Sequence, residues 1–135
     1  MLTRLLLLLL LLLGSSPAFA TDKADGPYLF DLLKQQAYLS AWKAMLSGEA
    51  VPDWVGSYAK TFNGPSTPSK DVPVGADTYT LAWVCKAHDC ADNQLYILFA
   101  PGGKQAWGLL VVKEKQRFLD HPNEAIQAAL KQAVH

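Results

Sequence analysis

Residues 78–112, TYTLAWVCKAHDCADNQLYILFAPGGKQAWGLLVV, decide the fold of this chain. Over 78–83, large apolar side chains alternate with small or polar ones, which is the pattern of a strand with one buried face. Residues 95–100 form a continuous apolar run, Pro101-Gly102-Gly103 follows as a turn, and 106–112 is a second apolar run. Consecutive strands with short connections predict an antiparallel meander.

Helical patterns flank these strands on both sides. From Tyr28 to Leu46 the apolar residues keep roughly helical spacing, with room for a break near Ser40, and Asp25-Gly26-Pro27 has the composition of a helix entry. After 120–123 an apolar stripe with spacing i, i+3, i+4, i+7, i+8 predicts a last helix that lies on the sheet. Its members are Ile126, Ala129, Leu130, Ala133 and Val134.

The remaining segments carry weaker signals. Residues 52–55 predict a short helical turn, and the Pro- and Gly-containing stretch 63–77 predicts a connection with room for a short strand at 72–74. A short strand is expected at 117–119. The order helix, strands, helix predicts an α+β domain, in which the antiparallel meander sheet lies between an N-terminal helix layer and a C-terminal helix.

The chain opens with the pattern of an export signal. Residues 1–20 combine Arg4, an unbroken leucine run over 5–13 and the small-residue site Ala18-Phe19-Ala20. The leucine run is too short for a transmembrane helix of roughly 20 residues, and no cysteine follows the cut site to carry a lipid. We therefore expect residues 1–20 to be removed. Residues 21–135 should form a single domain without a membrane anchor, located in the periplasm of a Gram-negative cell.

The mature chain is close to electrical neutrality. Removal of Arg4 with the leader leaves 11 basic and 12 acidic residues. This balance excludes a strong field for nucleic acid or for anionic lipid, and it supplies little long-range steering. A tight partner must therefore be held by local fit.

The two cysteines of the chain enclose the segment Cys85-Lys86-Ala87-His88-Asp89-Cys90. In an oxidising compartment an isolated close pair is most simply a disulfide. The ring would hold His88 in few conformations at the tip of a narrow finger. An imidazole there suits a site with two carboxyl groups, since neutral histidine offers one donor and one acceptor. Retaining glycosidases, lysozyme among them, hold such a pair about 5 Å apart.

Other interpretations of the same residues remain open. The disulfide can be purely structural and His88 an ordinary exposed histidine. A metal site would join the two cysteines and His88 with Asp92, but this spacing is cramped for tetrahedral geometry and oxidation competes. A redox pair is normally Cys-x-x-Cys, and no serine lies in a recognisable nucleophile elbow. We expect no metal, no cofactor and no enzymatic activity.

Several aromatic and histidine residues outside this segment have simpler interpretations. Four tryptophans could suggest a sugar-stacking surface, but each lies in an apolar periodic stretch, so core packing is expected: Trp42, Trp54, Trp83 and Trp107. His121 precedes Pro122 and is interpreted as part of a helix-capping region. His135 ends the chain, and 113–115 is interpreted as a solvated turn.

The segment 85–90 resembles the loop of the inhibitor of vertebrate lysozyme family, secreted bacterial proteins that block lysozyme. The resemblance extends to the leader, the mature size and the order of elements. It implies a five-stranded antiparallel sheet, which requires a strand before Thr78, and a disulfide between the loop cysteines. It also implies a loop histidine that enters the lysozyme cleft and bonds to both catalytic carboxyl groups.

By position this role falls on His88, with Lys86, Ala87 and Asp89 beside it in the contact. Ala87 is a departure, because the resemblance leads us to expect proline there, and its loss loosens the finger. The chain is therefore predicted to be a periplasmic inhibitor of C-type lysozyme that protects peptidoglycan from the host enzyme, a role in virulence.

Two alternatives accompany this prediction. The cell's own lytic transglycosylases are a related target of the same loop. A small periplasmic hydrolase or glycan-binding module is a different class of function. Nothing in the pattern distinguishes a monomer from a homodimer.

Overall fold

The computed structural model describes residues 25–134, so the signal peptide expected at 1–20 lies outside the described residues, as does His135. Three helices come first: α1 (Leu29–Leu32), α2 (Gln36–Leu46) and α3 (Asp53–Thr61). Five strands follow: β1 (Ser66–Val74), β2 (Asp77–Cys85), β3 (Asn93–Phe99), β4 (Ala106–Val112) and β5 (Lys115–Leu119). A single 3₁₀ turn, η1 (Pro101–Gly103), joins β3 to β4, and the helix α4 (Glu124–Ala133) comes last.

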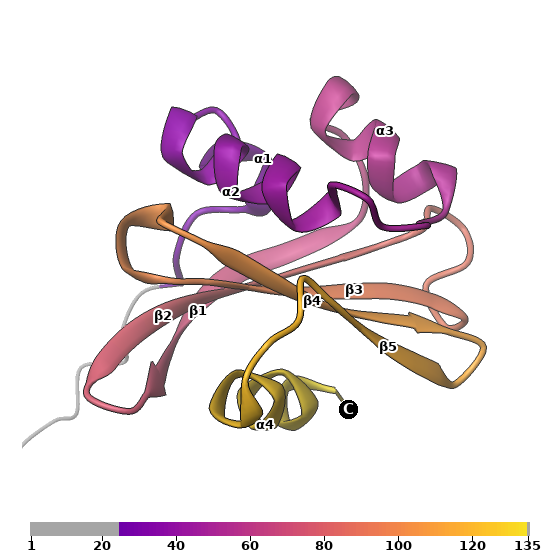
Figure 1. Cartoon of the computed structure of the whole chain (residues 1–135). Helices are drawn as coiled ribbons and strands as arrows, with labels where there is room; N and C mark the ends of the chain where they lie inside the picture. The colour runs from indigo at the N-terminus through magenta and orange to yellow at the C-terminus, as the bar shows by residue number, and fades with distance from the viewer. Residues whose placement is uncertain (1–24, 135) are drawn as a thin grey trace, which may run out of the picture.

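The five strands form one sheet in the order β1-β2-β3-β4-β5, and each neighbouring pair is antiparallel. The helices α1 to α3 cover one face of this sheet and α4 lies against the other (Figure 1). The predicted α+β fold, a five-stranded meander between two helical layers, is confirmed. None of the helices in the described part of the chain is long and apolar enough to cross a membrane.

The central strand β3 explains the continuous apolar run in the sequence. Leu95, Ile97 and Phe99 belong to the core beneath α1 to α3, while Tyr96 and Leu98 belong to the core beneath α4. All five side chains are at most 2% exposed. A strand that is covered on both faces has no solvated side, and it therefore loses the alternation that marks β2.

The N-terminal helices differ from the prediction in where they break. The 28–46 helix is interrupted at 33–35 and not near Ser40. Leu33 and Trp42 are both buried in the same core, yet nine residues of continuous α-helix are about two and a half turns and would point them to opposite sides. The interruption allows both side chains to face the sheet.

The segment expected to be a helix entry is instead paired with a strand. The Gly26 N–H donates to the Ser69 carbonyl at 2.9 Å, and the Ser69 N–H donates to the Pro27 carbonyl at 3.0 Å. The N-cap of α1 is Tyr28. Residues 25–27 thus cover part of the edge of β1. The next helix, α3, is also longer than the turn predicted at 52–55.

The edge strand β1 replaces most of the predicted connection at 63–77. It contains Pro68 and Pro73 and alternates exposed with partly buried positions. Proline has no N–H for a ladder and is tolerated at a sheet edge, where one side of the strand is unpaired. The register shifts between Thr67 and Lys70, and the two-residue turn that follows begins at Gly75, with φ 60°.

A charged contact ties the α2–α3 connection to β5. Arg117 Nη1 donates to Glu49 Oε2 at 2.6 Å, and the Asp120 N–H donates to Glu49 Oε1 at 3.2 Å. These two donors, the Asp120 N–H first and the Arg117 guanidinium second, hold the pKa of the Glu49 carboxyl below its ordinary value. The carboxylate therefore stabilises the folded chain only while it is ionised.

Replacing Glu49 with Gln should lower the free energy of unfolding at neutral pH by about 1–2 kcal/mol, because hydrogen bonds to a charged group are lost beside a partly exposed arginine. Since the folded-state pKa lies below the ordinary value of 4.5, this contribution is present above 4.5 and disappears as the pH falls through the folded-state pKa. Urea unfolding of the wild type and of Glu49→Gln, at neutral pH and at about pH 3, measures this contribution.

The difference between wild type and Glu49→Gln should shrink in acid. A matched control is Glu114→Gln, whose carboxylate lies on an exposed turn and should give a difference near zero at both pH values. A Glu49→Gln effect that is independent of pH would show that the carboxylate charge is not what stabilises the contact.

Candidate functional site

The segment 85–90 lies where β2 turns back into β3, at one end of the sheet (Figure 1). Cys85 and Gln94 form the last pair of the β2–β3 ladder. Beyond it, the Lys86 N–H donates to the Asn93 carbonyl at 3.1 Å, and the Cys85 N–H donates to the Pro65 carbonyl at 3.2 Å. The loop thus leaves the sheet from a base that is hydrogen-bonded on both sides, and the predicted position at the end of a hairpin is confirmed.

A disulfide joins Cys85 to Cys90, as predicted, with their Cα atoms 5.0 Å apart. Loop-entropy arithmetic for six residues gives about 2 kcal/mol of stabilisation. Since both sulfurs are bonded to each other, they are not thiolates that could hold a metal ion. Within residues 25–134, no three His, Cys, Asp or Glu side chains are grouped as a metal site would require.

A tight turn presents His88 at the tip of the loop. The Asp89 N–H donates to the Lys86 carbonyl at 3.0 Å, which makes Ala87 the second and His88 the third residue of a four-residue turn. His88 has a φ of 64°, whereas Ala87 is not among the residues with positive φ. This combination is that of a type II turn. Lys86, Ala87 and His88 are all exposed.

Asp89 and Asn93 brace the loop from within. The Asn93 side-chain amide donates to Asp89 Oδ2 at 2.8 Å, and the Asn93 N–H donates to the Asp89 carbonyl at 3.1 Å. The Asp89 side chain is therefore engaged inside the loop, and its predicted contact with a partner stays a prediction. Asn93 was not singled out from the sequence, where a polar residue before an apolar run carries no distinguishing signal.

The two-residue turn between β4 and β5 contacts the base of this loop. Lys113 and Glu114 have φ values of 48° and 66°, the arrangement of a type I′ turn, which favours Asn-Gly. The Lys113 N–H donates to the Asp92 carbonyl at 2.8 Å. Both side chains are exposed, as expected of a solvated turn, but the backbone is strained and supports the loop.

The other histidine within the described residues lies away from the loop. His121 is exposed on the β5–α4 connection, with a φ of 48°. The residue that caps α4 is Asn123, whose side chain accepts a hydrogen bond from the Ile126 N–H at 3.0 Å. His121 thus precedes the cap and does not form it.

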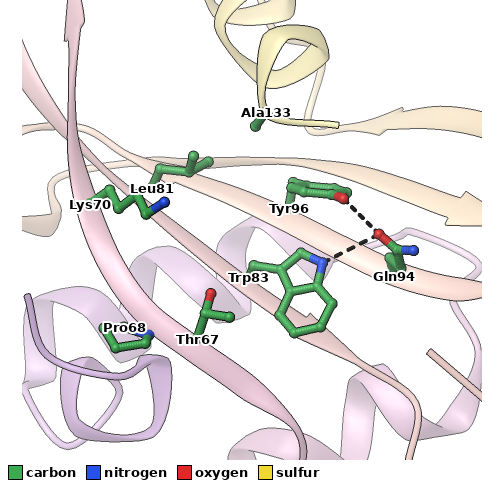
Figure 2. Close-up of a pocket in the computed structure, with 8 residues that line it drawn as sticks. All are labelled: Thr67, Pro68, Lys70, Leu81, Trp83, Gln94, Tyr96 and Ala133. Atoms are coloured by element: carbon green, nitrogen blue, oxygen red, sulfur yellow. Dashed lines mark hydrogen bonds between the residues drawn. The ribbon is translucent and has the colours of Figure 1, made fainter. Parts of the chain in front are cut away.

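A cavity of about 340 Å³ lies on the α4 side of the sheet, near the base of the loop (Figure 2). Its lining comes from β1, β2, β3 and α4 and includes Thr67, Lys70, Leu81, Trp83, Gln94 and Tyr96. Of the four tryptophans only Trp42 is fully buried, at 1% exposure, and the other three are half-buried. The expected core packing is confirmed in part for Trp83, because it packs against the core beneath α4 and also forms a wall of this cavity.

Comparison with known proteins identifies the family of the chain. The sequence model of a family described as "Inhibitor of vertebrate lysozyme (Ivy)" matches residues 37–135. This range contains the whole sheet, the disulfide-closed loop and α4. The chain belongs to the inhibitor of vertebrate lysozyme family.

Individual members of the inhibitor of vertebrate lysozyme family resemble the chain over most of its length. The protein named Inhibitor of vertebrate lysozyme in Pseudomonas aeruginosa is 38% identical over 131 residues, which are 96% of this chain and 80% of that protein. A protein of the same name in Escherichia coli K12 is 28% identical over 85 residues, 63% of this chain and 51% of the relative. Both relatives are named as inhibitors and not as enzymes, which agrees with the expectation of no enzymatic activity.

A third relative has no function in its name. An uncharacterized protein of Yersinia pestis is 33% identical over 114 residues, which are 82% of this chain and 71% of that protein. The part of the chain that it matches is thus mostly shared with the part that the Pseudomonas inhibitor matches.

In this member of the inhibitor of vertebrate lysozyme family, converting the β4–β5 turn to Asn-Gly should raise the free energy of unfolding. The double variant Lys113→Asn with Glu114→Gly should gain about 1–3 kcal/mol, because both new residues tolerate a positive φ. Urea unfolding measures the gain.

The matched control, Lys115→Asn with Gln116→Gly, moves the same two residues into β5, where they are disfavoured, and should lower the free energy of unfolding. If the 113/114 variant is no more stable than the wild type, the turn is not strained.

Proposed function

We propose that this protein inhibits C-type lysozyme by inserting the 85–90 loop into the active-site cleft of the enzyme, with His88 as the central contact. Membership of the family supports lysozyme as the target. The observation that carries the mechanism is the exposed imidazole at the tip of a disulfide-closed turn that projects from the end of the sheet.

The chemistry of the contact follows from the two ring nitrogens of His88. A retaining glycosidase needs one protonated and one ionised carboxyl group, about 5 Å apart. A neutral imidazole donates to the ionised group and accepts from the protonated one. An imidazolium between two carboxylates contains the same number of protons and forms stronger, charge-assisted bonds. In either state, one side chain occupies both catalytic groups and excludes substrate.

The loop is ordered before it meets the enzyme, which favours tight binding. Three constraints act on it: the disulfide, the turn hydrogen bond from Asp89 to Lys86, and the Asn93–Asp89 pair. Each removes conformations that binding would otherwise have to restrict. Affinity therefore depends on a preformed shape and not on the near-neutral charge of the chain.

The residues beside His88 have different roles in this proposal. Lys86 and Ala87 are exposed next to the tip and would meet the walls of the cleft, where the small Ala87 side chain keeps the finger narrow. Asp89 is half-buried and bound to Asn93. It would act mainly by fixing the shape of the turn.

We further propose that the chain is exported on residues 1–20 and acts in the periplasm. There it would protect peptidoglycan from host lysozyme that has crossed the outer membrane, which would contribute to virulence. The cell's own lytic transglycosylases cleave the same polymer with a catalytic acid and are a related target. A site with one carboxyl group would engage only one nitrogen of His88, so weaker inhibition is expected there.

Substituting His88 should abolish inhibition while the fold is preserved. His88→Asn removes the imidazole but keeps a residue that tolerates a positive φ, and His88→Ala tests the same contact with a smaller side chain. We expect the concentration for half-inhibition of hen egg-white lysozyme in a cell-wall lysis assay to rise about 100-fold or more, as for truncation of a buried charged contact.

His121→Asn is the matched control, because His121 is also exposed and has a positive φ but lies outside the loop. It should inhibit like the wild type. Undiminished inhibition by His88→Asn would refute the proposed contact, and wild-type protein that does not slow lysis, or that cleaves a small glycan, would refute the proposed function.

Replacing Ala87 with proline should strengthen the loop. Ala87 occupies the second position of a type II turn, which favours proline, and its N–H donates to no backbone carbonyl of residues 25–134. The free energy of unfolding should rise by about 0.4–1 kcal/mol, and the half-inhibitory concentration should stay the same or fall.

Lys86→Pro is the matched control, because it removes the N–H that donates to Asn93. It should weaken both stability and inhibition. A large loss of inhibition in Ala87→Pro would mean that the turn changes its backbone conformation in the complex.

A further inference from the structure

The cavity on the α4 side of the sheet has polar groups arranged around an aromatic wall (Figure 2). We propose that it is a second binding site, which takes an N-acetylated amino sugar carrying a carboxylate, the class of sugar that occurs in peptidoglycan. This site is separate from the 85–90 loop, and the proposal does not depend on inhibition of lysozyme.

Strand register brings the lining residues together. Trp83 pairs with Thr67 of β1 on one side and with Tyr96 of β3 on the other. The helix α4 has just two fully buried side chains, Ile126 and Leu130, and it ends at Ala133, which lies at the rim of the cavity. A volume of about 340 Å³ is at the lower end of the range for small-molecule sites, roughly 300–1,000 Å³, which suits one or two sugar rings.

Gln94 offers an oriented hydrogen-bond donor. Its Oε1 accepts from the Tyr96 hydroxyl at 2.6 Å and from the Trp83 indole N–H at 3.4 Å (Figure 2). An indole N–H can only donate, so the atom that faces it must be the amide oxygen. The amide nitrogen then points away from both aromatic rings, and it bonds to no residue within 25–134. It can donate to an acetamido carbonyl or to a sugar hydroxyl.

Trp83 supplies a surface for the apolar face of a sugar ring. Its indole is half-buried, and its N–H donates to Gln94 at 3.4 Å, so the orientation of the ring is restrained before a ligand arrives. The C–H face of a pyranose packs on such a ring, while its hydroxyl and acetamido groups project from the edge toward polar partners.

Lys70 supplies the charge that favours an acidic sugar. It lies opposite Leu81, two residues from Trp83 along β2 and hence about 7 Å away along the strand. Its ammonium forms no ion pair with any residue of the described part. A carboxylate on a sugar stacked against Trp83 can reach it and form a charge-assisted bond. A neutral sugar in the same position forms no such bond, so it gains much less binding energy from Lys70.

An NMR titration of the ¹⁵N-labelled mature protein tests the proposal with three disaccharides. The first joins N-acetylglucosamine to N-acetylmuramic acid, the second is N,N′-diacetylchitobiose, which lacks the carboxylate, and the third is cellobiose, which also lacks the acetamido groups. Saturable shifts are expected at the Trp83 indole N–H and at the Gln94 side-chain amide. Affinity should fall about tenfold from the first sugar to the second, and further to the third.

Four variants separate the contacts. Trp83→Leu should lose at least tenfold in affinity for the acidic disaccharide, and Trp107→Leu, another half-buried tryptophan outside the cavity lining, should lose none. Lys70→Met should bind the first two sugars equally. Gln94→Glu keeps an acceptor for Tyr96 but loses the donor, and it tests the site if Trp83→Leu does not fold.

Absence of saturable shifts, or equal affinity for all three sugars, would overturn the proposal. So would shifts at Trp83 that follow protein concentration without sugar, because these would assign the cavity to a second copy of the chain. Lysozyme inhibition measured on the same samples is an independent readout. Wild-type protein that inhibits lysozyme but binds no sugar refutes this proposal alone, and wild-type protein that binds the sugar but does not inhibit refutes the lysozyme contact alone.

Discussion

The register of β2 and β3 begins with the pair Thr80 and Phe99 and ends with the pair Cys85 and Gln94. This register positions both proposed binding surfaces, the 85–90 loop and the cavity on the α4 side of the sheet. A slip of one residue would turn every side chain of β3 to the other face of the sheet. Both faces of β3 are buried, under α1 to α3 on one side and under α4 on the other. The two cores therefore oppose the slip together, and the point at which the loop leaves the sheet is set by packing far from its tip.

Sequence reasoning succeeded where a signal is local. Alternation along β2, the apolar run of β3 and the Pro-Gly-Gly turn each reflect what one strand or turn requires by itself, so the meander and the position of the loop could be predicted. The disulfide followed from two cysteines five positions apart and from the export signal predicted at residues 1–20. Family resemblance added a five-stranded sheet, which the structure contains. The proposed role of His88 came from the resemblance together with the chemistry of imidazole, and it stays a prediction.

Features that depend on how the elements pack together could not be predicted from the sequence. β1 carries Pro68 and Pro73, and its polar exposed positions look like a connection until its place at the sheet edge is known. The break at 33–35 follows from the need to bury Leu33 and Trp42 on one side, which helical spacing alone did not locate. The cavity draws residues from four elements, so no stretch of sequence marks it, and the half-buried state of Trp83 depends on where α4 ends.

Trp83 and Cys85 lie two residues apart on one strand, so their side chains are on the same face. A ligand in the cavity at Trp83 could therefore affect the loop that begins at Cys85. Ligand binding shifts a conformational equilibrium only by its difference in affinity between two states. The disulfide, the Lys86–Asn93 bond and the Lys113–Asp92 bond constrain the base of the loop, so the structure offers no second loop arrangement that a ligand at Trp83 would favour. A sugar at Trp83 should therefore leave the loop unchanged and act by proximity. Retention on the polymer that lysozyme cleaves would raise the effective concentration of the loop near the enzyme without any new contact between the two proteins.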